Sequence, residues 1–106
     1  MNIRFSAGAV RCRATRDELD SLLAGRAVAL EVAMPRHHAF RLNVRPAMVG
    51  GWLLDSDPTG VWITIPRAAL ESLAQMLPSK EGVENRFDLE NGGAVVVSFE
   101  VDLQQP

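Results

Sequence analysis

The order of secondary structure elements is set by residues 10–24, whose sequence is VRCRATRDELDSLLA. The first five residues alternate between apolar and charged side chains, which is typical of a strand with one buried face. Thr15 and Glu18 then have the spacing of a capping box, in which each side chain accepts a hydrogen bond from a backbone N–H at the start of a helix. Leucines at 19, 22 and 23 supply the buried stripe of that helix, and Gly25 ends it. The stretch therefore predicts a strand that runs directly into a short helix.

A second stretch, residues 61–75 (VWITIPRAALESLAQ), repeats this pattern at an offset of 51 residues. Five positions are identical in the two stretches, namely Val10/Val61, Arg16/Arg67, Leu19/Leu70, Ser21/Ser72 and Leu22/Leu73. In each copy a strand turns sharply into a helix and a β-hairpin follows. Two βαββ halves related by a pseudo-twofold axis, residues 10–46 and 61–102, are one interpretation, and two independent amphipathic helices are the other. On the first interpretation, Leu22 and Leu73 are equivalent core residues.

The rest of the chain reads as short strands separated by turns. Alternating apolar residues predict strands over 2–5, 28–34, 40–44 and 61–65, while residues 49–54 fit either an edge strand or a loop. Asn91-Gly92 lies between two alternating runs, which is the strongest short-range hairpin signal. It predicts a two-residue turn bracketed by a Glu90–Gly93 pair, with the following apolar residues on the core face: Val95, Val97, Phe99 and Val101.

These elements predict one α+β domain over residues 1–106. Its sheet is a mostly antiparallel, curved sheet or partial barrel of about seven or eight strands, accompanied by two short helices. A chain of 106 residues with 47% hydrophobic and 23% charged residues is long and apolar enough to fold without a disulfide or metal.

Several classes of protein are excluded by composition. The longest apolar runs, residues 27–30 and 94–97, are too short to cross a bilayer, and residues 1–5 lack the apolar core of a signal peptide. A single cysteine, Cys12, suits a reducing compartment. We therefore expect a cytoplasmic protein with no membrane partner. A net charge of −2 gives no general attraction to nucleic acid.

The net charge conceals an asymmetry between the two halves of the chain. Residues 1–50 carry eight basic and four acidic side chains (8 − 4 = +4), and residues 51–106 carry three basic and nine acidic ones (3 − 9 = −6). Either the two halves neutralise one another within one chain, or a twofold partner sets the basic half of one copy against the acidic half of the other.

Arginines supply the candidate anion-binding site. Arg11 and Arg13 share one face of a predicted strand, and Arg41 and Arg45 share one face of another. If those strands were neighbours, four guanidiniums would form a cradle for a phosphate-bearing small molecule. The alternative, which the charge asymmetry favours, is a solvated sheet face whose arginines pair with acidic residues of the second half: Asp88, Glu90, Glu100 or Asp102.

No catalytic constellation emerges from the sequence. His37 and His38 are adjacent in a turn, with no further ligand at the spacing that metal sites require. Cys12 has no histidine near it in sequence to activate a thiolate. We expect no metal, no cofactor and no catalytic residue.

Two apolar side chains lie on strand faces where polar ones are expected. Trp62 points to the other face of its predicted strand from Val61 and Ile63. Val96 likewise points to the other face from Val95 and Val97. Such residues indicate a second packing surface, covered by a helix or by a partner subunit. Together with the charge asymmetry they predict a homodimer with Trp62 and Val96 in its interface.

Two family resemblances bear on this interpretation. The segments Ile3–Phe5, residues 10–15 and Glu18–Leu19 resemble an uncharacterised bacterial family of small proteins, in which a hydrophobic–Arg–x–Arg–x–Thr strand runs into a helix and a long β-hairpin ends the chain. This resemblance implies a fold and no function. Residues 63–70 (ITIPRAAL) are more faintly similar to the CYTH superfamily of triphosphate tunnel enzymes, whose inward Arg-x-Arg pairs hold polyphosphate. The first strand departs from that family because it lacks the Glu-x-Glu-x-Lys motif.

The sequence thus favours a non-enzymatic interaction or regulatory module. The alternative is a phosphate- or nucleotide-binding domain, including a degenerate CYTH-like tunnel protein.

Overall fold

The computed structural model describes residues 1–102, which form eight strands and two helices. In chain order these are β1 (Asn2–Ser6), β2 (Ala9–Ala14), α1 (Arg16–Leu23), β3 (Val28–Met34), β4 (His38–Ala47), β5 (Leu53–Asp57), β6 (Gly60–Pro66), α2 (Arg67–Met76), β7 (Val83–Asp88) and β8 (Ala94–Val101). The segment that sequence analysis left ambiguous contributes the start of β5.

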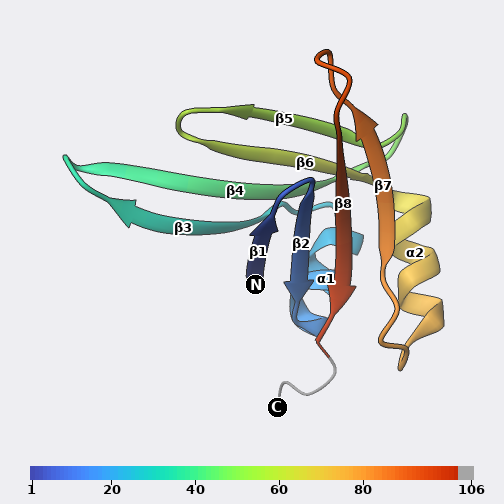
Figure 1. The fold of residues 1–106 in the computed structure, drawn as a ribbon. Helices are drawn as coiled ribbons and strands as arrows, with labels where there is room; N and C mark the ends of the chain where they lie inside the picture. Colours follow the sequence, from blue (N-terminus) through green and yellow to red (C-terminus); the bar gives the residue numbers. More distant parts are fainter. Residues whose placement is uncertain (103–106) are drawn as a thin grey trace.

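The strands divide between two sheets, which we call sheet A (order β1-β2-β8-β7) and sheet B (order β3-β4-β6-β5). Strands of sheet A stand upright in Figure 1, and those of sheet B lie across the view. In sheet A β2 and β8 are parallel, as are β4 and β6 in sheet B, while the outer pairs are antiparallel. The α+β class, the eight strands and the two helices are confirmed, and four of the six strand pairs are antiparallel, but the expected single sheet is wrong. Residues 1–102 form two open mixed sheets and no closed barrel.

The parallel pairs arise because each half of the chain gives one hairpin to each sheet. Hairpin β1–β2 joins β7–β8, and β3–β4 joins β5–β6. Strands β1 and β5 start and end 51 residues apart, as the sequence offset predicts. Beyond the helices the offset becomes 55, since Val28 pairs with Val44 and Val83 pairs with Phe99. Strand order and register therefore repeat between the halves, while a duplication as their origin stays a prediction.

Helix α1 begins at the predicted capping box. Thr15 Oγ1 accepts a hydrogen bond from the Glu18 N–H (3.1 Å), and Glu18 Oε1 accepts one from the Thr15 N–H (2.9 Å). Burial alone would raise the pKa of Glu18. Hydrogen bonds from Thr15 and from the Met1 ammonium, 3.0 Å away, outweigh burial and lower that pKa. The carboxylate is thus ionised at neutral pH, where it suits the positive end of the helix.

The core lies between the inner faces of the two sheets, where both helices insert leucines. Leu19 and Leu22 of α1 and Leu70 and Leu73 of α2 are fully buried. They pack in one cluster with apolar strand residues, including Cys12, Val44, Ile63, Ile65, Val97 and Phe99. The predicted burial of Leu22 and Leu73 is confirmed. No helix within residues 1–102 has the length and apolar character needed to span a membrane.

The C-terminal hairpin forms, but the predicted two-residue turn is wrong. Asp88 pairs with Ala94, and the loop of residues 89–93 is closed by a hydrogen bond from the Leu89 N–H to the Gly93 carbonyl (2.8 Å). This register sets Phe87 opposite Val95 on the core face. A Glu90–Gly93 pair would have moved Phe87 opposite Val96, onto the outer face, so burial of Phe87 overrides the local turn preference. Val97, Phe99 and Val101 are buried as predicted, and Val95 packs half-buried against the core.

Truncation of either central helix leucine tests the equivalence of the halves. Leu22→Ala and Leu73→Ala each remove a fully buried side chain, so we expect each to lower the free energy of unfolding by about 2–5 kcal/mol. Urea denaturation followed by circular dichroism measures this loss. Leu53→Ala is the matched control because that side chain is 61% exposed, and it should change stability little. A Leu22 or Leu73 variant as stable as the control would contradict the equivalent core positions.

Candidate functional site

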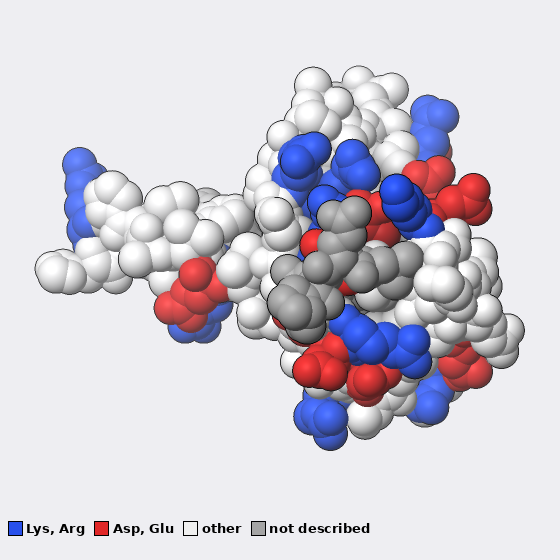
Figure 2. Space-filling model, turned by 90° about the horizontal axis from the view of Figure 1, so that it is seen from below, with Lys and Arg blue, Asp and Glu red and all other residues white. Residues whose placement is uncertain are grey.

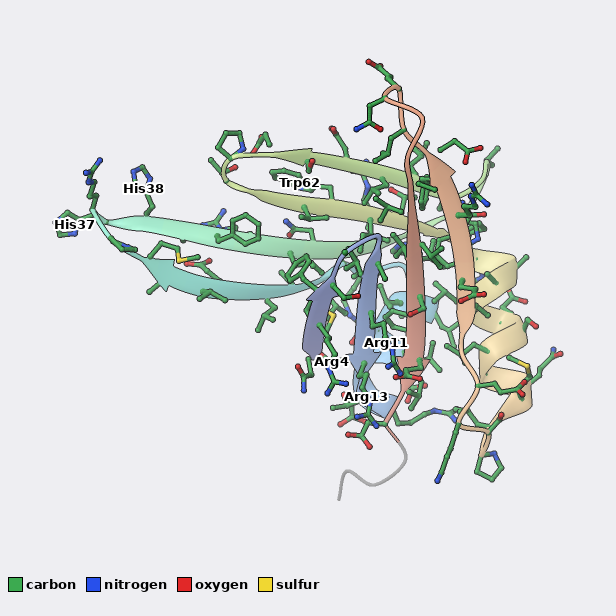
Figure 3. All side chains as sticks on the ribbon, in the orientation of Figure 1. Arg4, Arg11, Arg13, His37, His38 and Trp62 are labelled. Atoms are coloured by element: carbon green, nitrogen blue, oxygen red, sulfur yellow. The ribbon has the colours of Figure 1, made fainter. Side chains whose placement is uncertain are left out.

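On the outer face of sheet A, strands β1 and β2 bring three arginines together. Arg4 of β1 is the Cα partner of Arg11, and Asn2 is the partner of Arg13, so their side chains share one surface (Figure 3). Arg11 Nη2 lies 3.0 Å and Arg13 Nε 3.3 Å from the same Glu100 carboxylate oxygen. Asp102 is a further partner of Arg13, at 3.8 Å. Basic residues of the first half are therefore paired with acidic residues of the second half within one chain.

Sequence analysis did not single out Arg4. A small depression is lined by Asn2, Arg4, Arg11 and Arg13, and no carboxylate of residues 1–102 lies within 4.0 Å of the Arg4 guanidinium. Arg4 alternates with Ile3 and Phe5, and a hairpin turn follows at residues 7–8. That alternation and the turn together are a sequence signal that could have placed Arg4 opposite Arg11.

The other two predicted arginines lie on the outer face of sheet B. Arg41 Nε donates to Glu31 at 3.0 Å, and Arg45 Nε donates to Thr64 Oγ1 at 3.1 Å. Because β2 lies between β1 and β8, and β4 lies between β3 and β6, the two arginine pairs are not neighbours. The predicted cradle of Arg11, Arg13, Arg41 and Arg45 is not formed.

Trp62 occupies the centre of the outer face of sheet B. Its Cα partners are Asn43 on β4 and Asp55 on β5, and its side chain is half-buried. Both helices pack through their leucines against the opposite, inner face, so neither covers the indole. Around it lies an open depression of about 490 Å³, lined by Arg45, Leu53, Leu54, Asp55, Asp57, Trp62 and Thr64.

The charges in this Trp62 depression are mixed. Asp57 accepts hydrogen bonds from the Thr59 hydroxyl (2.6 Å) and backbone N–H (2.7 Å), which lower the pKa of the carboxyl and keep it ionised. Arg45 is held by its bond to buried Thr64, and within residues 1–102 no carboxylate approaches its guanidinium within 4.0 Å. The depression thus presents an aromatic surface, an oriented guanidinium without a carboxylate partner, and carboxylates at its edge.

Corresponding positions of the two halves carry different residues on the outer faces of the two sheets. By the strand registers, Trp62 is the counterpart of Arg11, and the Thr64–Arg45 pair is the counterpart of the Arg13–Glu100 pair. Sheet A carries a cation and an anion that neutralise each other at these two positions. Sheet B carries a hydroxyl and a cation there, so no carboxylate at these two positions balances the positive charge of Arg45.

Val96 does not extend the surface around Trp62. It is half-buried on the outer face of sheet A, where its Cα partners are Ala9 and Arg86. Since Trp62 belongs to sheet B, the two residues do not share one sheet face, and a dimer interface that includes both stays a prediction.

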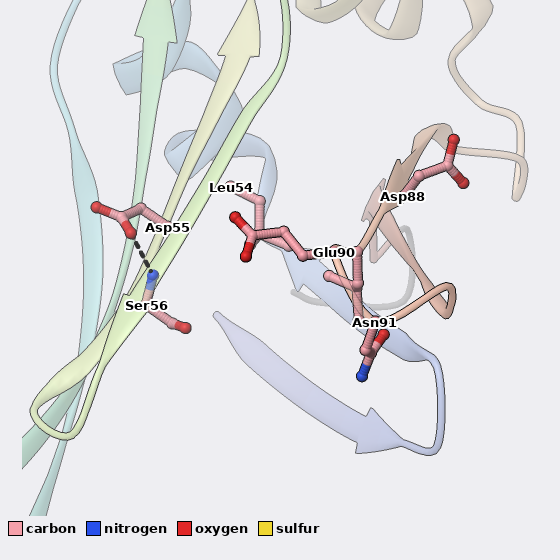
Figure 4. A pocket seen from close by; sticks show the side chains of 7 residues that line it. Leu54, Asp55, Ser56, Asp88, Glu90 and Asn91 are labelled. Atoms are coloured by element: carbon pink, nitrogen blue, oxygen red, sulfur yellow. Dashed lines mark hydrogen bonds between the residues drawn. The ribbon is translucent and has the colours of Figure 1, made fainter.

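The remaining polar positions offer no assembled chemistry. A shallow depression between β5 and the β7–β8 loop is lined by Leu54, Asp55, Ser56, Asp88, Leu89, Glu90 and Asn91 (Figure 4). His37 and His38 lie at the exposed tip of the β3–β4 hairpin (Figure 3). Across residues 1–102, no group of three or more His, Cys, Asp or Glu side chains is arranged to hold a metal ion.

Cys12 is placed as a core residue. Its side chain is fully buried, and burial raises the pKa of the thiol to about 12. At neutral pH the thiol is therefore protonated and a poor nucleophile.

No protein-family model matches the chain, and no curated protein or solved structure is significantly similar to it. Both resemblances noted from the sequence remain predictions. A tunnel of the CYTH kind needs strands that close on themselves, whereas the part of the chain described here forms two open sheets.

The burial of Cys12 predicts a thiol that resists modification. With a chromogenic disulfide reagent at neutral pH, we expect the folded protein to react only as fast as it unfolds, because the thiol is both inaccessible and protonated. In urea the same protein should react as a free thiol. Rapid labelling of the folded protein would contradict the buried placement of Cys12.

Proposed function

We propose that the protein is a non-enzymatic interaction module that binds a segment of another protein on the outer face of sheet B. The observation that carries this proposal is the Trp62 depression, in which a half-buried indole lies beside Arg45, a guanidinium with no carboxylate partner in residues 1–102. Tryptophan and arginine are the residue types that dominate binding energy at protein interfaces. A rigid indole offers a large apolar area at low cost in conformational entropy.

The carboxylates around Trp62 favour a protein segment over a phosphate compound. Asp55 and Asp57 line the same depression as Arg45, and Asp57 is ionised. A phosphate bound by Arg45 would be repelled by these carboxylates. A protein segment that carries an apolar side chain between an acidic and a basic one satisfies all three features: indole, guanidinium and carboxylates.

The burial of Cys12 supports binding rather than catalysis. The only thiol of the chain is enclosed in the core with a raised pKa. The solvent-accessible groups of the Trp62 depression, an indole, a guanidinium and carboxylates, are suited to packing, hydrogen bonding and ion pairing. The face around Trp62 therefore has the chemistry of a recognition surface.

A displayed library of random peptides tests the proposal. Peptides selected by the protein should combine an apolar or aromatic residue with an acidic one, and amide chemical shifts should change on β4, β5 and β6. We expect Trp62→Ala to weaken the selected peptides by at least 2 kcal/mol, about thirtyfold in affinity, as truncation of a hot-spot residue does.

Two controls locate the binding. Trp52→Phe alters the other tryptophan, which packs against the core, and should leave affinity unchanged. Arg45→Gln should weaken peptides with an acidic residue more than those without one. Peptides that bind equally well to Trp62→Ala would place the interaction elsewhere and overturn the proposal.

A second candidate function, phosphate binding, rests on the outer face of sheet A. Arg4 lies beside Arg11 and Arg13 and has no carboxylate partner among residues 1–102, so one positive charge remains available there. Arginine is well suited to phosphate, because its planar donors match the phosphate oxygens.

Titration with inorganic pyrophosphate decides this second candidate. If the face binds phosphate groups, amide shifts of β1 and β2 should saturate, and Arg4→Gln should abolish the effect. Arg86→Gln is a matched control, because Arg86 is also exposed on the outer face of sheet A but is paired with Asp88. Shifts that persist in Arg4→Gln, or no shifts at all, would remove this function.

A further inference from the structure

The four edge strands of the two sheets differ in how they are protected. Edges β1 and β7 bound sheet A, and edges β3 and β5 bound sheet B. Proteins protect edges with charged side chains, because an unpaired edge is a template for another strand. Edge β1 carries Arg4, β5 carries Asp55 and Asp57, and β7 carries three charged residues in its sequence VENRFD.

Strand β3 has the least of this protection for its length. It is the longest edge, with seven residues, and its sequence VALEVAM contains a single charge, Glu31. That charge is paired with Arg41 of the neighbouring strand, 3.0 Å away. No proline interrupts the strand, so its outward backbone groups are free to accept a partner strand.

The tip of the β3–β4 hairpin also projects from the body of the protein (Figure 1). Residues 31–38 are all exposed, and the Val32 and Met34 side chains are each 46% exposed. Figure 2 shows the projecting arm with few charged side chains between its tip and its base. Its apolar side chains therefore meet water on a face that elsewhere in sheet B is buried.

We propose that β3 pairs antiparallel with β3 of a second copy, which joins two copies of sheet B into one eight-stranded sheet. Residues 30–34 are self-complementary in the antiparallel direction: large apolar residues stand at 30, 32 and 34 on one face, and Glu31 and Ala33 stand on the other. A twofold axis at Val32 sets Leu30 against Met34 of the other copy. It also sets Glu31 against a small Ala33, so that like charges do not meet. An isologous contact needs this kind of symmetry.

The contact is small and independent of the Trp62 depression. Pairing one short edge buries less surface than the roughly 1,200–2,000 Å² of a standard stable interface, so the dimer should dissociate on dilution. Trp62 lies on β6, which β4 separates from β3. The Trp62 depression of each copy therefore stays open in the dimer.

Sedimentation of the intact chain over a range of concentrations tests the proposal. We expect a reversible monomer–dimer equilibrium. Val32→Lys and Ala33→Lys alter exposed side chains of β3 on its two faces, so each should fold and each should abolish the dimer. In the unaltered protein, amide hydrogen exchange of β3 should slow as concentration rises, which gives a readout that does not depend on a variant.

Matched variants separate this inference from the proposed function. Ser56→Lys adds the same charge to exposed edge β5 and should leave the dimer intact. Trp62→Ala should also leave it intact, although it weakens peptide binding. A monomer at every concentration, or a dimer that survives Val32→Lys and Ala33→Lys and shows no protection of β3, would overturn the β3 dimer while leaving peptide binding untouched.

Discussion

The parallel pairing of β2 with β8 and of β4 with β6 is the constraint on which the rest of the structure depends. Ala9 pairs with Val96, so the first hairpin of sheet A is completed only by the last strand of the chain. In sheet B, Gly60 pairs with Arg41, so that sheet also draws on both halves. Each helix then closes the space between two sheets that neither half builds alone, and the leucines of both helices share one core.

This interleaving also decides which surface remains available to a partner. It lays the basic strand β2 against the acidic end of β8, where Glu100 pairs with Arg11 and Arg13, and Asp102 also pairs with Arg13, on the outer face of sheet A. In sheet B the corresponding positions carry Thr64 and Arg45, which satisfy one hydrogen bond and leave a net positive charge. The indole of Trp62 stands where sheet A has a paired arginine. One scaffold therefore presents two different outer faces. On sheet A, Arg11 and Arg13 are paired with carboxylates and Arg4 has no such partner within residues 1–102, whereas sheet B presents an open aromatic face.

The local structure, the buried face of each strand and the repeated pattern could be predicted from the sequence. The Thr15–Glu18 capping box and the alternation in each strand depend on neighbours within a few residues. Such local patterns can therefore be read from the sequence alone. Alternation states which face of a strand is buried but not which strand lies beside it. For that reason the split into two sheets and the separation of Arg13 from Arg45 could not be derived. The predicted register of the β7–β8 hairpin was wrong for a related reason. Packing of Phe87 against the core outweighs the turn preference of Asn91-Gly92.

The crossing between the two halves has a consequence for how the chain can be divided. Residues 48–51, between β4 and β5, are exposed and join the halves by a single connection. A cut there leaves two fragments, each with two hairpins that lack their sheet partners and a helix that lacks its core. We expect neither fragment to fold alone, because each supplies the sheet partners and core residues that the other lacks. The two halves are thus related as the subunits of an obligate heterodimer, although one chain contains both. Separated, they are suited to a split reporter whose structure forms only when the two fragments bind each other.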